Sequence, residues 1–234
     1  MLFRSTLFLP YEGKPGFENL STPEEVNAFF KKDFPDALEL MPELADDFFS
    51  NPTGHLVTIR CKPWVFEDKY AIIGDAVHAM VPFYGQGMNA AFEDCTEINR
   101  LVGIHGNNWA KVFAEYEKNR LAHGNAIADL ALDNFIEMRD KVGDKAWVFK
   151  KSLEHLLEKE FPESYVSRYE LISFSRVPYA EAQQTGEINA GILEELASGL
   201  SSPESFDRNL AKSLILQKLG NRVAGWKSAG LLTL

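Results

Sequence analysis

The first half of the chain alternates between extended apolar runs and one helical stretch. Met1–Pro10 and Leu56–Phe66 have the apolar and β-branched content of strands, and Tyr70–Ile73 is a short apolar run typical of a buried strand. Between the first two, Ser21–Asp47 offers a capping hydroxyl, a proline in the first turn and apolar residues at helical spacing. The pattern predicts a small sheet accompanied by short helices.

The second half is patterned as helices. An amphipathic stretch runs over residues 109–139, and the pair His123-Gly124 leaves open either one bent helix or two helices. Residues 144–160 indicate a second helix pair, and residues 188–200 and 206–219 indicate two more helices. This half is therefore expected to be mainly helical.

Together these patterns predict an α+β or α/β fold in two domains. Residues 1–103 would hold the sheet, and residues 104–234 would form a mainly helical domain. With 45% hydrophobic and 12% aromatic residues, the 234-residue chain can build a sizeable core. Its net charge of −10 is spread without a basic stripe, so nucleic acid is not an expected partner.

The two cysteines, Cys61 and Cys95, lie far apart and in no metal-ligand spacing. The sequence has no signal-peptide pattern and no apolar run long enough to span a bilayer, and its last ten residues contain a lysine. We therefore expect reduced thiols, a cytoplasmic location, no bound metal and no membrane anchor.

The segment Ile72–Cys95 carries the clearest chemistry. At the end of a short strand, Gly74-Asp75 places a carboxylate that can accept hydrogen bonds from ligand hydroxyls. Further on, Gly85–Asn89 contains two glycines that let the backbone approach a flat ligand, followed by a helix whose first N–H groups are free. A flavin needs both features, whereas an ordinary strand–turn–helix corner is the alternative. The FAD contacts expected from this pattern are Gly74, Asp75, Gly85, Gln86 and Gly87.

The string Gly74–Pro82 followed by Gly85–Asn89 resembles the second flavin motif of the single-component aromatic flavoprotein hydroxylases. Read through Cys95, it is most similar to the kynurenine 3-monooxygenases, and the resemblance covers nearly all of the chain to about Glu181. It implies part of an FAD and substrate domain followed by a C-terminal helical domain. It also implies FAD, NADPH and O₂ as reactants in the hydroxylation of L-kynurenine to 3-hydroxykynurenine, with no side chain of this chain acting as a nucleophile.

The resemblance also implies substrate contacts. In this family an asparagine at the place of Asn134 contacts the kynurenine carboxylate, and Tyr169 resembles a second carboxylate-binding residue, although a core tyrosine is the alternative. Met138 lies one helical turn after Asn134 and would pack on the substrate ring. Pro82 and Phe83 would wall the pocket. His78 is expected to have a structural role. Asn89 is expected to cap its helix, a role that does not exclude ligand contact, and the resemblance implies that Met88 and Asn89 also contact the flavin ring of FAD.

Family members begin with a strand, a G-x-G-x-x-G turn and a helix that hold the ADP half of the flavin, and this sequence has no such motif. We therefore expect a fragment, or a half that works beside a separate N-terminal FAD-binding partner, which would also supply an arginine and a tyrosine for the substrate carboxylate. Alone, the chain is expected to be inactive and colourless. The alternatives are a related hydroxylase of another aromatic acid and a non-enzymatic remnant that binds an aromatic ligand or a partner protein.

Overall fold

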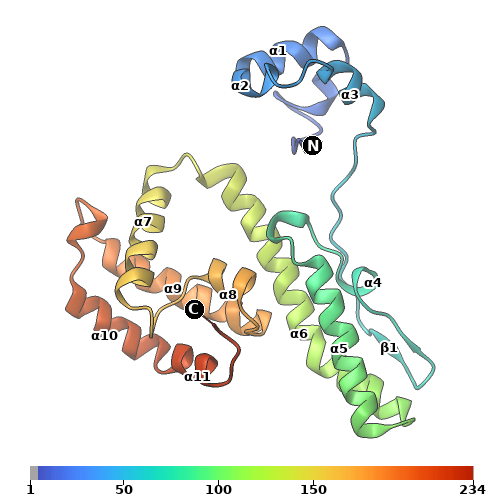
Figure 1. The fold of residues 1–234 in the computed structure, drawn as a ribbon, viewed down its shortest axis with the longest axis vertical. Helices are drawn as coiled ribbons and strands as arrows, with labels where there is room; N and C mark the ends of the chain where they lie inside the picture. The colour runs from blue at the N-terminus through green and yellow to red at the C-terminus, as the bar shows by residue number, and fades with distance from the viewer. Residues whose placement is uncertain (1–4, 234) are drawn as a thin grey trace. The chain divides into compact units, whose positions relative to one another are not determined.

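The computed structural model describes residues 5–233, which are mostly helical (Figure 1). The chain divides into two compact units, one up to His55 and one from Leu56 onward. The boundary expected between residues 103 and 104 falls inside helix α5 of the second unit. None of the helices in residues 5–233 is long and apolar enough to cross a membrane.

The first unit is built from short helices. Thr22 caps α1 through a capping box, in which its Oγ1 accepts from the Glu25 N–H at 3.3 Å and the Glu25 carboxylate accepts from the Thr22 N–H at 3.1 Å. Val26 and Phe30 on this helix are buried in the small core of the unit. The elements are η1 (Phe17–Asn19), α1 (Pro23–Asp33), α2 (Pro35–Leu38) and α3 (Leu44–Ser50).

The prediction of a sheet is largely wrong, because residues 5–233 contain only one short two-stranded sheet. Residues 5–10 form no strand, and Met1–Arg4 lie outside the described residues. In the second unit, β1 (Val65–Phe66) pairs antiparallel with β2 (Tyr70–Ala71), so most of the strand expected over residues 56–66 is absent. A strand needs a neighbour for its backbone groups. Residues 56–63 make one backbone hydrogen bond to another segment, from Ile59 N–H to Ala79 O at 2.8 Å, which is too few for a strand.

The centre of the second unit is a pair of long helices, α5 (Gly87–His105) and α6 (Trp109–Ile136), which lie side by side (Figure 1). Of the two arrangements left open at His123-Gly124, the single helix is the one observed, because α6 runs through Gly124 without a break. A Cβ at this position would lie 2.8 Å from Trp64 Cη2 and 3.0 Å from the His78 ring. Gly124 is therefore a place of close packing rather than a helix stop.

Short elements connect these helices to a C-terminal helical layer. Helix α7 is a single helix capped by Asp144, not the expected pair. The two helices expected after residue 188 are present with shifted starts. The remaining elements are α4 (Asp75–His78), η2 (Pro82–Tyr84), the π-helix η3 (Glu137–Lys141), α7 (Lys145–Glu160), α8 (Arg168–Phe174), α9 (Tyr179–Ala197), η4 (Pro203–Ser205), α10 (Arg208–Leu219) and α11 (Arg222–Ser228).

Candidate functional site

The Gly74-Asp75 turn leads from the hairpin into α4. Gly74 has φ +61° and ψ −137°, and a Cβ there would lie 3.1 Å from the Cβ of Ala91 on α5. Both the backbone conformation and the close approach therefore favour glycine at this position. Asp75 is the first residue of α4 and is exposed, so its carboxylate faces solvent.

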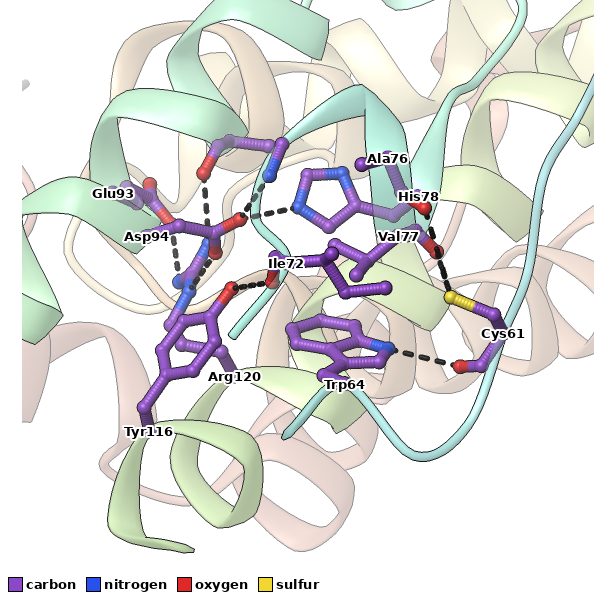
Figure 2. A network of polar contacts seen from close by, with 12 residues as sticks. Cys61, Trp64, Ile72, Ala76, Val77, His78, Glu93, Asp94, Tyr116 and Arg120 are labelled. Carbon is purple, nitrogen blue, oxygen red and sulfur yellow. Dashed lines mark hydrogen bonds and ion pairs between the residues drawn. The ribbon is translucent and has the colours of Figure 1, made fainter. Parts of the chain in front are cut away.

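A buried carboxylate fixes this turn. Asp94 on α5 accepts from the Gly74 N–H at 3.0 Å, lies 2.7 Å from His78 Nε2, and accepts from Arg120 Nε on α6 at 2.8 Å (Figure 2). Burial opposes ionisation of Asp94, but the hydrogen bonds from His78, Arg120 and Gly74 outweigh it and lower the pKa of this carboxyl below its ordinary value. Arg120 also pairs with Glu93 at 2.6 Å. One anion thus joins the turn, α4, α5 and α6.

Aromatic side chains support the network from one side. The Trp64 indole is 1% exposed, its ring centroid lies 5.6 Å from that of His78, and its Nε1–H donates to Cys61 O at 2.9 Å (Figure 2). The Tyr116 hydroxyl donates to Ile72 O at 3.2 Å. His78 is 1% exposed and enclosed by these groups, which supports the structural role favoured by its sequence context.

The N-terminus of α5 differs from the expected cap. Gln86, not Asn89, is the N-cap residue, and it makes no capping hydrogen bond to the helix backbone. Its Oε1 instead accepts from Asn89 Nδ2 at 2.8 Å and from the Tyr179 hydroxyl at 3.0 Å. The first turn of α5 therefore keeps N–H groups without a side-chain acceptor. Gly85, with φ +67°, has nothing within 4 Å of its Cβ position, and Met88 is 68% exposed.

The expected substrate contacts on η2 and at the end of α6 are brought together. Asn134 Nδ2 donates to Phe83 O at 2.9 Å and lies 3.8 Å from Met138 Sδ. The rings of Phe83 and Phe135 are 4.8 Å apart between centroids. Pro82, the first residue of η2, is exposed. The segment η2 and the end of α6 thus form one surface, in which the amide of Asn134 is surrounded by apolar side chains.

Tyr169 lies near the same face but is not buried. It is 52% exposed, so the alternative of a core tyrosine is wrong. Its ring lies 6.2 Å from that of Tyr84 on η2 and 6.0 Å from that of Phe174. It therefore joins the site through aromatic contact and presents part of its side chain to solvent.

Sequence reasoning missed the charged pair in this region. Arg168 Nη2 donates to Glu137 Oε1 at 2.8 Å, and both side chains are about four-fifths buried, at 20% and 19% exposure. Burial raises the pKa of Tyr84, while the nearby Arg168 guanidinium opposes that rise. The sequence marks Glu137 as one of several polar residues near Asn134. Its partner, Arg168, lies 31 positions further along the chain, and no pattern in the sequence around it predicts this pairing.

Comparisons with known proteins show which proteins this chain is similar to. A family model described as an FAD binding domain matches residues 45–131. The chain is 46% identical to the kynurenine 3-monooxygenase of Myxococcus xanthus over 217 residues, which is 93% of this chain and 47% of that protein. It is 48% identical to the kynurenine 3-monooxygenase of Dictyostelium discoideum over 231 residues, which is 93% of this chain and 50% of that protein.

A further kynurenine 3-monooxygenase, from Flavobacterium johnsoniae, is 47% identical over 194 residues, covering 83% of this chain and 44% of that protein. The chain thus spans about half the length of the curated relatives it matches. The matched FAD model includes the Gly74-Asp75 turn, the glycines before α5 and the Asp94 network. The expected resemblance is confirmed: over nearly its whole length, this chain is a homologue of about half of a kynurenine 3-monooxygenase.

Proposed function

We propose that this chain forms the ribityl and ring side of an FAD site, together with one wall of the substrate pocket, in an enzyme that hydroxylates L-kynurenine to 3-hydroxykynurenine with NADPH and O₂. The observation that carries the proposal is the N-terminus of α5, where backbone N–H groups lack a side-chain cap and the two preceding glycines leave open space. The kynurenine 3-monooxygenases to which the chain is similar supply the substrate class.

The residues of this segment fit a flavin. A Cβ on Gly85 would meet nothing within 4 Å, and one on Gly87 would meet only Met80 Cγ, at 3.9 Å, so a flat ligand can approach the backbone here. The positive end of the 19-residue helix α5 favours an electron-rich group, such as the N1 and C2=O edge of a reduced flavin. The exposed Asp75 can accept from ribityl hydroxyls.

Asn134 suits a carboxylate. Its amide nitrogen has two hydrogens: one is donated to Phe83 O at 2.9 Å, and the other faces only Met138 Sδ at 3.8 Å, which is a weak acceptor. That second hydrogen can be donated to a substrate carboxylate without breaking the bond that orients the amide. Met138 and Phe83 then supply apolar contact for the aromatic ring.

Bound FAD, once reduced by NADPH, would supply activated oxygen to the aromatic ring of the substrate. The residues of this chain bind, orient and exclude water, and none of them is required as a nucleophile. We further propose that contacts to the ADP half of FAD come from residues outside this sequence, in a separate N-terminal FAD-binding half. The chain alone should therefore carry negligible flavin when purified.

A complementation assay tests this proposal. The chain is mixed with the N-terminal half of the Myxococcus xanthus relative, and 3-hydroxykynurenine formation is followed with FAD and NADPH. We expect hydroxylation of L-kynurenine in the mixture and none with either half alone. NADPH oxidation coupled to hydroxylation of salicylate or 4-hydroxybenzoate, but not of L-kynurenine, would instead favour another aromatic acid as substrate. An assembled pair that binds FAD and oxidises none of these substrates would contradict the enzyme function.

A further inference from the structure

Arg168 joins three separate elements. It is the first residue of α8, its guanidinium donates to Glu137 at the start of π-helix η3, and the ring of the next residue, Tyr169, contacts that of Tyr84 at the end of η2, where the guanidinium also opposes the rise in the pKa of the Tyr84 phenol. The Arg168 and Glu137 side chains are only 20% and 19% exposed. A largely buried arginine of this kind needs its partners in place, because an unpaired buried charge is costly.

The three connected residues are sequence neighbours of the proposed substrate contacts. Tyr84 follows Phe83, Glu137 precedes Met138, and Arg168 precedes Tyr169. The rings of Tyr84 and Tyr169 also contact each other, with centroids 6.2 Å apart, next to the Arg168–Glu137 ion pair. Any shift of Arg168 relative to Glu137 or Tyr84 therefore changes the spacing among the residues that would face the substrate.

The stem of Arg168 is fixed from behind by α9. A Cβ on Gly186 would lie 2.5 Å from Arg168 Cδ, 2.9 Å from its Cγ and 3.0 Å from its Cβ, so the arginine lies directly on the helix backbone. Gly186 is buried in the middle of α9, where glycine is otherwise unfavourable. Its lack of a side chain makes room for the arginine.

The chemistry of this position favours arginine over lysine. A planar guanidinium has five N–H groups in a rigid fork, so it can donate to Glu137 and interact with Tyr84 at the same time. A lysine ammonium carries the same charge as a single point on a flexible stem. The π-turn that begins at Glu137 is a local departure from α-helix geometry of the kind often found at functional sites.

We propose that Arg168 is a positioning residue of the substrate site: it holds η2, η3 and α8 in one arrangement, so that Phe83, Asn134, Met138 and Tyr169 face the same aromatic amino acid. The identity of that ligand rests on the proposed function. The positioning itself is a property of the unliganded chain and can be measured without a substrate.

The first test uses two glycines of the same helix. Gly186→Ala places a methyl group against the Arg168 stem without removing its charge, whereas Gly191→Ala adds one where nothing lies within 4 Å. We expect amide hydrogen exchange over residues 82–85 and 134–141 to rise about tenfold in Gly186→Ala and to stay unchanged in Gly191→Ala. Unchanged exchange at both segments in Gly186→Ala would overturn the proposal.

The second test removes the guanidinium. Arg168→Gln should raise exchange at the same two segments, and Arg168→Lys should not restore protection fully because it keeps the charge and loses the fork. The matched control is Arg208→Gln, which breaks a separate arginine–glutamate pair to Glu160, 2.7 Å apart, on α10 and α7. Full protection in Arg168→Lys would contradict the requirement for the guanidinium.

The same variants are then titrated with L-kynurenine by calorimetry. Arg168→Gln and Gly186→Ala should bind it about tenfold more weakly than the unaltered chain, while Arg208→Gln and Gly191→Ala should bind it equally well. Equal binding by all variants would overturn the substrate part of the proposal. These titrations use the chain mixed with the N-terminal half of the Myxococcus xanthus relative, which would supply the remaining carboxylate contacts. If the unaltered chain in this mixture does not bind L-kynurenine, the proposed ligand is wrong, and the exchange measurements still decide whether Arg168 positions the three elements.

Discussion

The carboxylate of Asp94 accepts a hydrogen bond from the backbone N–H of Gly74 at 3.0 Å, across twenty positions of sequence. This bond ties the Gly-Asp turn to the helix whose N-terminus holds the open glycines. Because Asp94 also contacts His78 and Arg120, the Gly74-Asp75 turn and the N-terminal part of α5 are both held by one buried carboxylate. The relative placement of Asp75 and the α5 N-terminus is therefore set by packing before any ligand arrives.

Replacing this anion should be costly. Asp94→Asn places its amide N–H₂ opposite either the Gly74 N–H or the Arg120 Nε–H, so that donor faces donor, and it leaves Arg120 with Glu93 as its remaining acidic partner among the described residues. We expect a loss of about 3–5 kcal/mol in the free energy of unfolding by urea titration. Asp140→Asn, in a half-exposed pair with Arg139, should leave that free energy unchanged. An equally small effect at both positions would contradict the role of Asp94.

The same group predicts a pH dependence. The native-state pKa of Asp94 is lowered, so its contribution to stability is present above the unfolded-state pKa of about 3.9 and is lost as pH falls through the native value. The difference in unfolding free energy between the unaltered chain and Asp94→Asn should therefore be constant near neutral pH and shrink below about pH 4. Urea titrations at a series of pH values measure this. A difference that grows in acid would have the wrong sign.

Gly124 should resist substitution although it lies within a helix. Gly124→Ala gains about 1 kcal/mol in helix propensity but overpacks Trp64, whose Cη2 would lie 2.8 Å from the new Cβ, at a cost of about 1–3 kcal/mol. We expect no net stabilisation, or a loss, by thermal unfolding. Gly103→Ala on α5, where nothing lies within 4 Å, should raise the melting temperature. The opposite order would contradict the close packing of α6 on Trp64.

Asn134 can be tested by a change of one atom. Asn134→Asp cannot donate to Phe83 O, and its charge repels a substrate carboxylate. The affinity for L-kynurenine, measured by calorimetry, should fall about tenfold or more. Asn27→Asp removes a similar side-chain bond, 2.8 Å long, to the carbonyl of Pro23 in the first unit and should leave the affinity unchanged. Equal binding by both variants would remove Asn134 from the site.

Local signals in the sequence predicted the local structure well. The capping hydroxyl and first-turn proline expected after residue 21, and the helix expected after the two glycines, depend on residues a few positions apart, and the structure contains both helix starts. The sequence left one helix or two open at Gly124, because it does not show that Trp64, sixty positions earlier, lies against this glycine. Apolar content alone likewise favoured a strand over residues 56–64, where the described residues offer no strand partner.

The candidate site shows the same limit. The residues of the flavin motif follow one another in the sequence, so their proximity could be predicted. Asn134 and Met138 are one helical turn apart, so the sequence could also place them on the same side of a helix. The contact of Asn134 with Phe83 and the pair between Arg168 and Glu137 join distant positions, and no spacing rule connects them. Asn134 meets Phe83 because α6 packs against η2, and Arg168 meets Glu137 because α8 lies beside η3 in the folded chain.

The central claim is that the N-terminus of α5 receives a flavin ring, and a titration tests it most directly. Riboflavin and FAD are added separately to the chain, and quenching of flavin fluorescence is followed. We predict weak, saturable binding of both, reduced about tenfold by Gly87→Ala, whose methyl would enter the space left for the ligand, and unchanged by Gly103→Ala. Absence of saturable binding, or equal binding by Gly87→Ala, would contradict the claim.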